Sequence, residues 1–187
     1  MGYKETVEDM LAEIDRTLAH IDTGCLERAM RDLGDADRIF IAGAGRSGLV
    51  MRSFAIRLMH MGKQVFVVGE NVTPGIGEGD LLVIGSGSGR TDSLVAFAQK
   101  AKSVGSRLLL FTISPESPIG KLADLVVLIS APSHKVLVEM DHSTSMQPKG
   151  SLFEQSLFLV LDYLVIELMK RANLRSEDLF SRHANLE

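Results

Sequence analysis

The sequence contains a single cysteine, no tryptophan and no long run of apolar residues. With Cys25 alone an intramolecular disulfide is impossible, and its place in a helical pattern favours a small packed side chain over a catalytic thiol. No segment reaches the roughly 18 uninterrupted apolar residues that a membrane-spanning helix needs. The acid-rich first residues also lack the apolar core of a signal peptide. These absences predict a soluble, cytoplasmic protein that has no membrane partner.

The chain also lacks an excess of positive charge. Its 20 Lys and Arg residues are outnumbered by 24 Asp and Glu residues, which gives a formal net charge of -4 with His neutral. No long basic run is present that could neutralise a row of phosphates, so nucleic acid is not an expected partner. A length of 187 residues is enough for one domain with a sizeable core, and we expect a single domain over residues 1–187.

The apolar residues that are present follow two different periods. Short, unalternating runs rich in Val, Ile and Leu predict strands buried on both faces, at residues 38–43, 64–69, 80–85, 107–113 and 124–130. Helical spacing predicts two leading helices within about 4–34, and further helices at 47–61, 92–104, 118–123 and 152–172. Strands that alternate with helices predict a three-layer α/β/α sandwich around a five-stranded parallel sheet.

Two parts of this pattern are unusual. Residues 70–79 are few for a crossover between parallel strands, so we expect a compressed connection there. The helix at 152–172 is apolar over a broad surface, which predicts that another subunit covers part of it.

Two of the predicted strands end in glycine-rich turns that open helices, GAGRSG at 43–48 and GSGSGRT at 85–91. Ligands bind at the carboxyl ends of parallel strands, where a helix N-terminus offers free N–H groups to an anion. The first turn matches the dinucleotide fingerprint G-x-G-x-x-G, but Ser86, Ser88 and Thr91 in the second suit the oxygens of a phosphate monoester. Each turn can equally be an ordinary one in which a hydroxyl caps the next helix, and Ser47 can be such a cap.

Taken together, GAGRSG and GSGSGRT resemble the SIS (sugar isomerase) domain, which binds phosphosugars, and the resemblance extends over nearly the whole chain. The stretch GSLFEQSLFLVLD at 150–162 and the ending RHANLE at 182–187 resemble the 6-phospho-3-hexuloisomerase family within it. The resemblance implies an SIS fold that assembles as a homotetramer and needs no metal or organic cofactor. It also implies a phosphosugar substrate and an activity, the interconversion of D-arabino-hex-3-ulose 6-phosphate and D-fructose 6-phosphate, in formaldehyde fixation by the ribulose monophosphate pathway.

Other members of the SIS superfamily remain alternatives. They are isomerases of arabinose 5-phosphate or sedoheptulose 7-phosphate, and the phosphosugar-sensing modules of transcription regulators. About 38 residues precede the first predicted strand, which leaves little room for a helix-turn-helix domain.

The same resemblance assigns roles to individual residues. It places substrate binding at Ser47, Ser86, Gly87, Ser88, Gly89, Arg90 and Thr91. It makes Glu154 the catalytic base, which would move a proton between C2 and C3 through a cis-enediol. Spacing alone leaves a second interpretation open, in which Glu154 closes a capping box with Ser151.

His183 is our candidate for the group that moves protons between the sugar hydroxyls, because related sugar isomerases often take a histidine from a neighbouring subunit. The alternative is that it is an ordinary surface residue. His134 and His142 flank Glu139 and Asp141, but their spacing matches no compact metal motif, and we expect no metal site there.

Overall fold

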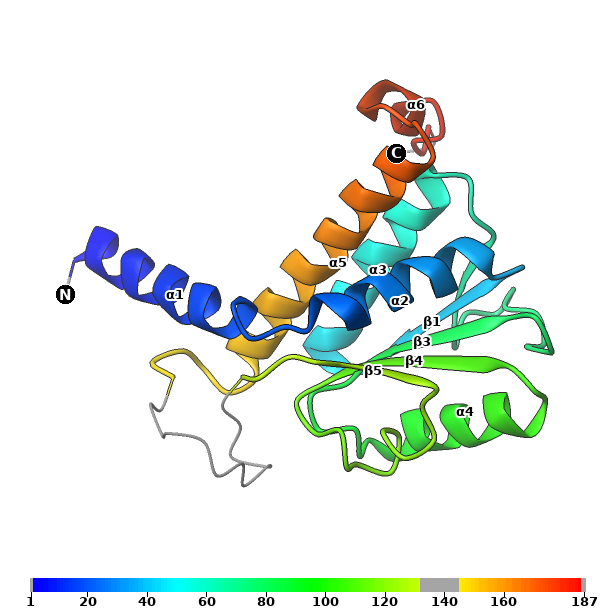
Figure 1. Ribbon diagram of the computed structural model, residues 1–187, viewed down its shortest axis with the longest axis horizontal. Coiled ribbons are helices and arrows are strands. Elements are labelled where there is room, and N and C mark those ends of the chain that lie inside the picture. Colours follow the sequence, from blue (N-terminus) through cyan, green and yellow to red (C-terminus); the bar gives the residue numbers. More distant parts are fainter. Residues whose placement is uncertain (1, 132–144, 186–187) are drawn as a thin grey trace.

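The computed structural model describes residues 2–131 and 145–185 of the chain. Its centre is a five-stranded parallel sheet with the strand order β2-β1-β3-β4-β5 (Figure 1). The strands are β1 (Ile39–Gly43), β2 (Val65–Val67), β3 (Leu81–Gly85), β4 (Arg107–Thr112) and β5 (Leu125–Leu128). All four neighbouring pairs are parallel. The five strands predicted from the apolar runs are therefore confirmed.

Helices cover both faces of the sheet. They are α1 (Tyr3–Leu18), α2 (Thr23–Asp35), α3 (Gly45–His60), α4 (Asp92–Ser103), α5 (Ser151–Arg171) and α6 (Ser176–Phe180). Figure 1 shows α4 on one face and α2, α3 and α5 on the other. The predicted three-layer α/β/α sandwich is thus confirmed.

The core consists of two layers because successive strand residues point to opposite faces of the sheet. Ile39 and Ile41 of β1 belong to the cluster that packs under α2, α3 and α5. Phe40 and Ala42 belong to the cluster that packs against α4. Burial on both faces explains why the strands show no alternation of apolar and polar residues.

Two short elements differ from the prediction. Residues 118–123 form turns and not the expected helix. The chain bends tightly here, because a β-carbon on Gly120 would lie 1.9 Å from the carbonyl oxygen of Pro115. The short helix α6 was not predicted, because five residues are too few to show helical periodicity. The compressed connection is confirmed: residues 68–80 contain no helix and lead from β2, past β1, to β3.

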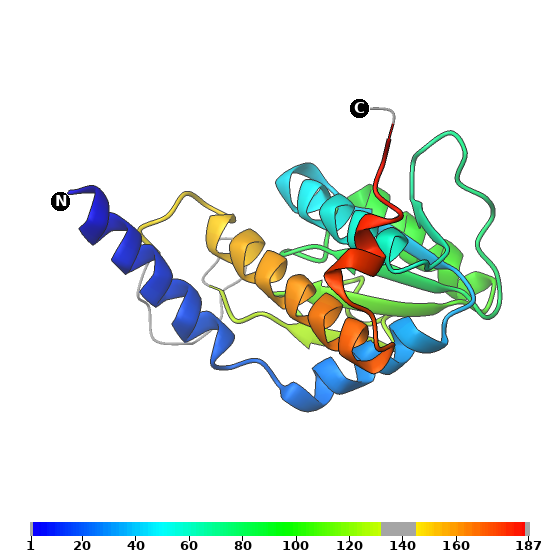
Figure 2. The same ribbon diagram turned by 90° about the horizontal axis from the view of Figure 1, so that it is seen from above.

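The two ends of the chain lie outside the sandwich. Helix α1 contacts α5 and extends beyond the sheet (Figures 1 and 2). Helix α6 contacts α3, and Figure 2 shows it lying across the ends of α3 and α5. Among the residues that the structure describes, no helix is long and apolar enough to span a membrane.

Candidate functional site

The two glycine-rich turns meet at the carboxyl edge of the sheet. Strands β1 and β3 are neighbours, and Gly43 pairs with Gly85, so both turns start side by side. Helix α5 begins at the same place, because a β-carbon on Gly87 would lie 3.3 Å from the ring of Phe153. The structure therefore brings Ser47, residues 86–91 and Glu154 to one edge of the sheet, as a shared site requires.

The first turn, which we call the α3 turn (residues 43–48), has a structural reason for its glycines. A β-carbon on Gly48 would lie 2.8 Å from the carbonyl oxygen of Gly43, so α3 packs directly against the end of β1. Gly45 has a φ of 56°, in the left-handed region that favours glycine. The N-cap of α3 is Ala44. Ser47 is thus inside the first turn of the helix and is not its cap.

The second turn, which we call the serine loop (residues 85–91), is held by its own polar groups. The buried Ser86 accepts a hydrogen bond through Oγ from the N–H of Gly89 at 3.2 Å. Gly89 has a φ of 58°, and a β-carbon there would lie 2.0 Å from Oγ of Ser117. The Ser88 hydroxyl oxygen accepts from the N–H of Arg90 at 3.3 Å. Ser86 therefore builds the loop, whereas Ser88 is partly exposed beside it.

The outer side of the serine loop has unused hydrogen-bond donors. Thr91 is the N-cap residue of α4, yet its side chain makes no capping hydrogen bond. The N–H groups of Gly87, Ser88 and Thr91 donate to no acceptor within the described part of the chain. The Arg90 side chain is exposed. Free N–H groups, two hydroxyls and the start of α4 form an arrangement suited to a phosphate.

Glu154 faces α3 and does not cap its own helix. Helix α5 begins after Gly150, so Ser151 is its first residue and the capping box does not form. Glu154 Oε2 accepts from Arg46 Nη1 at 2.8 Å, and Oε1 accepts from the Ser47 hydroxyl at 3.4 Å. Its side chain is 13% exposed. The capping interpretation is therefore wrong, and a shielded carboxylate lies beside Ser47, one residue after the Phe153 that packs near the serine loop.

His183 lies elsewhere in the same chain. Its ring stacks on that of His60 with 5.2 Å between centroids, and both line a cavity of about 320 Å³ along the second half of α5. That region is roughly 18 Å along the helix from Glu154, at 1.5 Å per residue. Burial, together with the charges of His183 and Arg57, lowers the pKa of His60. In one chain His183 does not reach Glu154.

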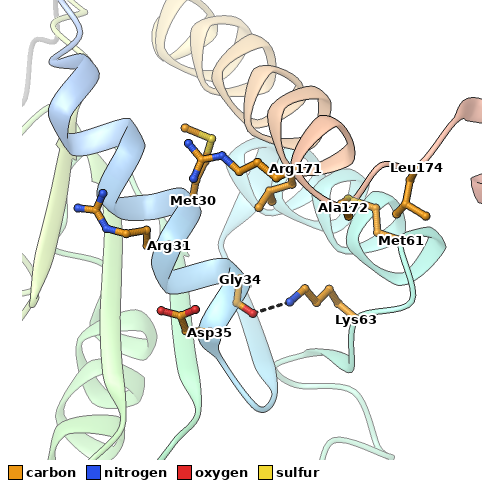
Figure 3. A pocket seen from close by; sticks show the side chains of 10 residues that line it. Met30, Arg31, Gly34, Asp35, Met61, Lys63, Arg171, Ala172 and Leu174 are labelled. Atoms are coloured by element: carbon orange, nitrogen blue, oxygen red, sulfur yellow. Dashed lines mark hydrogen bonds between the residues drawn. The ribbon is translucent and has the colours of Figure 1, made fainter.

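A second cavity, of about 340 Å³, lies between the carboxyl ends of α2, α3 and α5 (Figure 3). Lys63 Nζ donates to the Gly34 carbonyl at 2.7 Å there. Arg171, which also lines it, pairs with Glu27. Cations at helix carboxyl ends offset the helix dipoles and satisfy the last carbonyls. These basic side chains therefore have a structural purpose, far from both glycine-rich turns.

Neither Cys25 nor a metal cluster contributes to the site within the described residues. Burial raises the pKa of the Cys25 thiol, which accords with a packed rather than a reactive cysteine. Within residues 2–131 and 145–185, no group of three or more His, Cys, Asp or Glu side chains could hold a metal ion. His134 and His142 lie outside the described residues.

Known proteins resemble this chain over its whole length. The SIS domain family matches residues 32–161. The chain is 46% identical to the 3-hexulose-6-phosphate isomerase of Bacillus subtilis (strain 168), with all of both chains covered. It is 44% identical to that of Mycobacterium gastri, covering 94% of this chain and 86% of the relative. A crystal structure of a Methanococcus jannaschii protein has a TM-score of 0.84 to this chain at 33% identity, and the match covers 98% of this chain and 99% of that protein. The same activity is inferred for that protein from its structure. The chain therefore belongs to the SIS domain family, among the 3-hexulose-6-phosphate isomerases.

Proposed function

We propose that the chain interconverts D-arabino-hex-3-ulose 6-phosphate and D-fructose 6-phosphate, in agreement with the name 3-hexulose-6-phosphate isomerase of its relatives. The observation that carries this proposal is the position of Glu154. Its side chain is 13% exposed, and the preceding residue, Phe153, packs near Gly87 of a loop whose free donors suit a phosphate. An isomerase of this kind needs both features, a phosphate anchor and one shielded base.

The serine loop anchors the phosphate on C6. The hydroxyls of Ser88 and Thr91 and the N–H groups of Gly87 and Ser88 donate to its oxygens, and the N-terminus of α4 adds a favourable dipole. Ser86 and Gly89 keep the loop in shape, while the N–H of Arg90 donates to the Ser88 hydroxyl oxygen and orients that hydroxyl toward the phosphate. Ser47 lies across from this loop, on the side of the reacting carbons.

Glu154 moves the proton. It takes the proton from C2 of the hexulose phosphate, which leaves a cis-enediol between C2 and C3, and returns the proton to C3. At the same time a hydroxyl proton passes from O2 to O3, so that the carbonyl ends on C2. One carboxylate on one face of the two carbons suffices for the carbon-bound proton.

We also propose that the protein is a cytoplasmic homotetramer with sites near its subunit interfaces. Part of α3 and α5 is covered by large apolar side chains, which we call the α3–α5 apolar surface: Leu49, Ile56, Met59, Phe158, Leu159, Tyr163 and Ile166, all at least 40% exposed. Patches of this kind mark contacts between proteins. A neighbouring chain seated there would also bring another His183 closer to Glu154.

The test is a solvent-exchange assay by NMR. Purified protein in deuterated water is offered fructose 6-phosphate, arabinose 5-phosphate or sedoheptulose 7-phosphate. We expect deuterium at C3 of fructose 6-phosphate and a new hex-3-ulose signal. Faster turnover of either other sugar would show that the substrate is assigned wrongly.

The role of Glu154 is tested with Glu154→Gln in the same assay. Glutamine keeps the shape and still accepts from Arg46, so the variant should fold and bind while exchange falls about 100- to 10,000-fold. Glu167→Gln removes a partly exposed carboxylate, which pairs with Lys170 on the same helix, and should leave the rate unchanged. If Glu154→Gln exchanged at the parent rate, the base would be another residue.

A further inference from the structure

Arg46 joins the two helices of the site, yet the proton transfer described above does not use it. It is the second residue of α3, directly after the left-handed Gly45. Its Nη1 donates to Ser151 Oγ at 2.7 Å and to Glu154 Oε2 at 2.8 Å. One guanidinium nitrogen thus connects the first turn of α3 with the first turn of α5.

The two charges of this pair differ in exposure. The Glu154 side chain is 13% exposed, whereas that of Arg46 is 56% exposed. A shielded carboxylate is costly unless a charge or hydrogen bonds compensate it. Arg46, the more exposed partner of the pair, provides this compensation through its hydrogen bond to Oε2.

The two oxygens of Glu154 are held unequally. Oε2 has the short contact with Arg46, and within the described residues Oε1 has only the 3.4 Å contact with the Ser47 hydroxyl. A glutamate side chain has three rotatable bonds, and fixing one oxygen fixes the direction of the other. Oε1 is therefore the oxygen that remains available for a proton.

We infer that Arg46 is a positioning residue, which holds Glu154 through Oε2 so that Oε1 exchanges the proton with C2 and C3. This inference rests on the proposed isomerase function.

The test compares Arg46→Gln, Arg46→Lys and the control Arg52→Gln. Arg52 is on the same helix and pairs with Glu70, outside the site. For Arg46→Gln we expect kcat to fall about 10- to 100-fold, as a misplaced base would cause, while KM changes less. Arg46→Lys should recover only part of kcat, because its ammonium group can still donate to Glu154 but carries the charge on a shorter side chain of different geometry.

A merely structural role would lower the melting temperature while the folded Arg46→Gln variant kept the kcat of the parent, and that result would overturn the inference. A crystal structure of Arg46→Gln tests it without any assay: we expect the Glu154 carboxylate to leave the Ser47 hydroxyl, and an unmoved carboxylate would refute the positioning role. If the parent protein does not isomerise hexulose phosphate, the proposed function fails. The crystal structure of Arg46→Gln still decides whether Arg46 positions Glu154.

Discussion

At the scale of single residues, the serine loop uses its three hydroxyls in two ways. The Ser86 hydroxyl is buried and holds the N–H of Gly89, whereas Ser88 and Thr91 are partly exposed beside free N–H groups. Ser88→Ala and Thr91→Val should therefore each weaken fructose 6-phosphate binding by about 1 to 3 kcal/mol, the cost of losing a hydrogen bond to a charged group. Isothermal titration calorimetry measures this directly.

Two further variants sharpen that comparison. Ser86→Ala should mainly lower the melting temperature, because it removes a hydrogen bond inside the loop. Ser103→Ala, at the exposed far end of α4, should change neither binding nor stability. Unchanged affinity in both Ser88→Ala and Thr91→Val would show that the phosphate binds elsewhere.

Residue roles were predictable from sequence only where the signal is local. The glycines of the α3 turn and the serine loop stand out because close approach and positive φ demand glycine at fixed spacings. The partner of Glu154 did not stand out, since Arg46 is 108 positions away in the chain. The local capping-box pattern with Ser151 therefore competed with the catalytic interpretation, and only the fold decides against it.

At the scale of elements, the long periodic segments were predicted well and the short ones were not. All five strands were recognised from their apolar runs. Such runs occur because the strands are buried on both faces of the sheet. The turns at 118–123 and the five-residue α6 lie below the length at which periodicity is informative. Tertiary contacts shape such segments, and a single sequence does not show those contacts.

The attachment of α1 is a second element-scale property that only the structure shows. Glu13 of α1 accepts from the Ser145 hydroxyl, the Met146 N–H and the Gln147 side-chain amide, at 2.8, 2.8 and 2.9 Å. These residues lead into α5 and its Glu154. Burial acts to raise the pKa of Glu13, but the three hydrogen bonds outweigh it and lower the pKa below the usual 4.5.

This shift predicts a pH-dependent contribution to stability. A carboxyl whose pKa is lowered by folding stabilises the protein fully above its unfolded pKa and loses the contribution as pH falls through the lowered value. Glu13→Gln should therefore lower the free energy of unfolding by about 1 to 3 kcal/mol at pH 7. At pH values well below 4.5 its stability should approach that of the parent.

Urea unfolding at several pH values measures the difference. The matched control is Glu8→Gln, because Glu8 is on the same helix and, in the part of the chain that the structure describes, pairs only with the exposed Lys4 across one turn. That variant should show a small difference at every pH. A constant deficit of Glu13→Gln across the range would mean that the carboxylate charge is not what anchors residues 145–147.

At the scale of the whole molecule, the α3–α5 apolar surface and the position of His183 raise the same question, which is whether a neighbouring chain contributes to the site. Helix α5 was expected to be covered partly by another subunit. The side of α5 that faces away from the sheet carries half-exposed apolar side chains: Phe158, Leu159, Tyr163 and Ile166. His183 packs on His60 at the far end of that helix. If His183 acts in catalysis, it acts in the site of a neighbouring chain.

Co-expression of two inactive variants tests this arrangement. We expect Glu154→Gln and His183→Asn each to be inactive alone and to form tetramers by sedimentation, because neither residue belongs to the α3–α5 apolar surface. When each site takes its Glu from one chain and its His from another, random mixing rebuilds about a quarter of the sites. Activity near a quarter of the parent would show shared sites. Mixed tetramers without activity, or an active His183→Asn alone, would show that each chain works without its neighbour's histidine.

Ile166→Lys, which places a charge in the α3–α5 apolar surface, should give monomers and abolish the rescue.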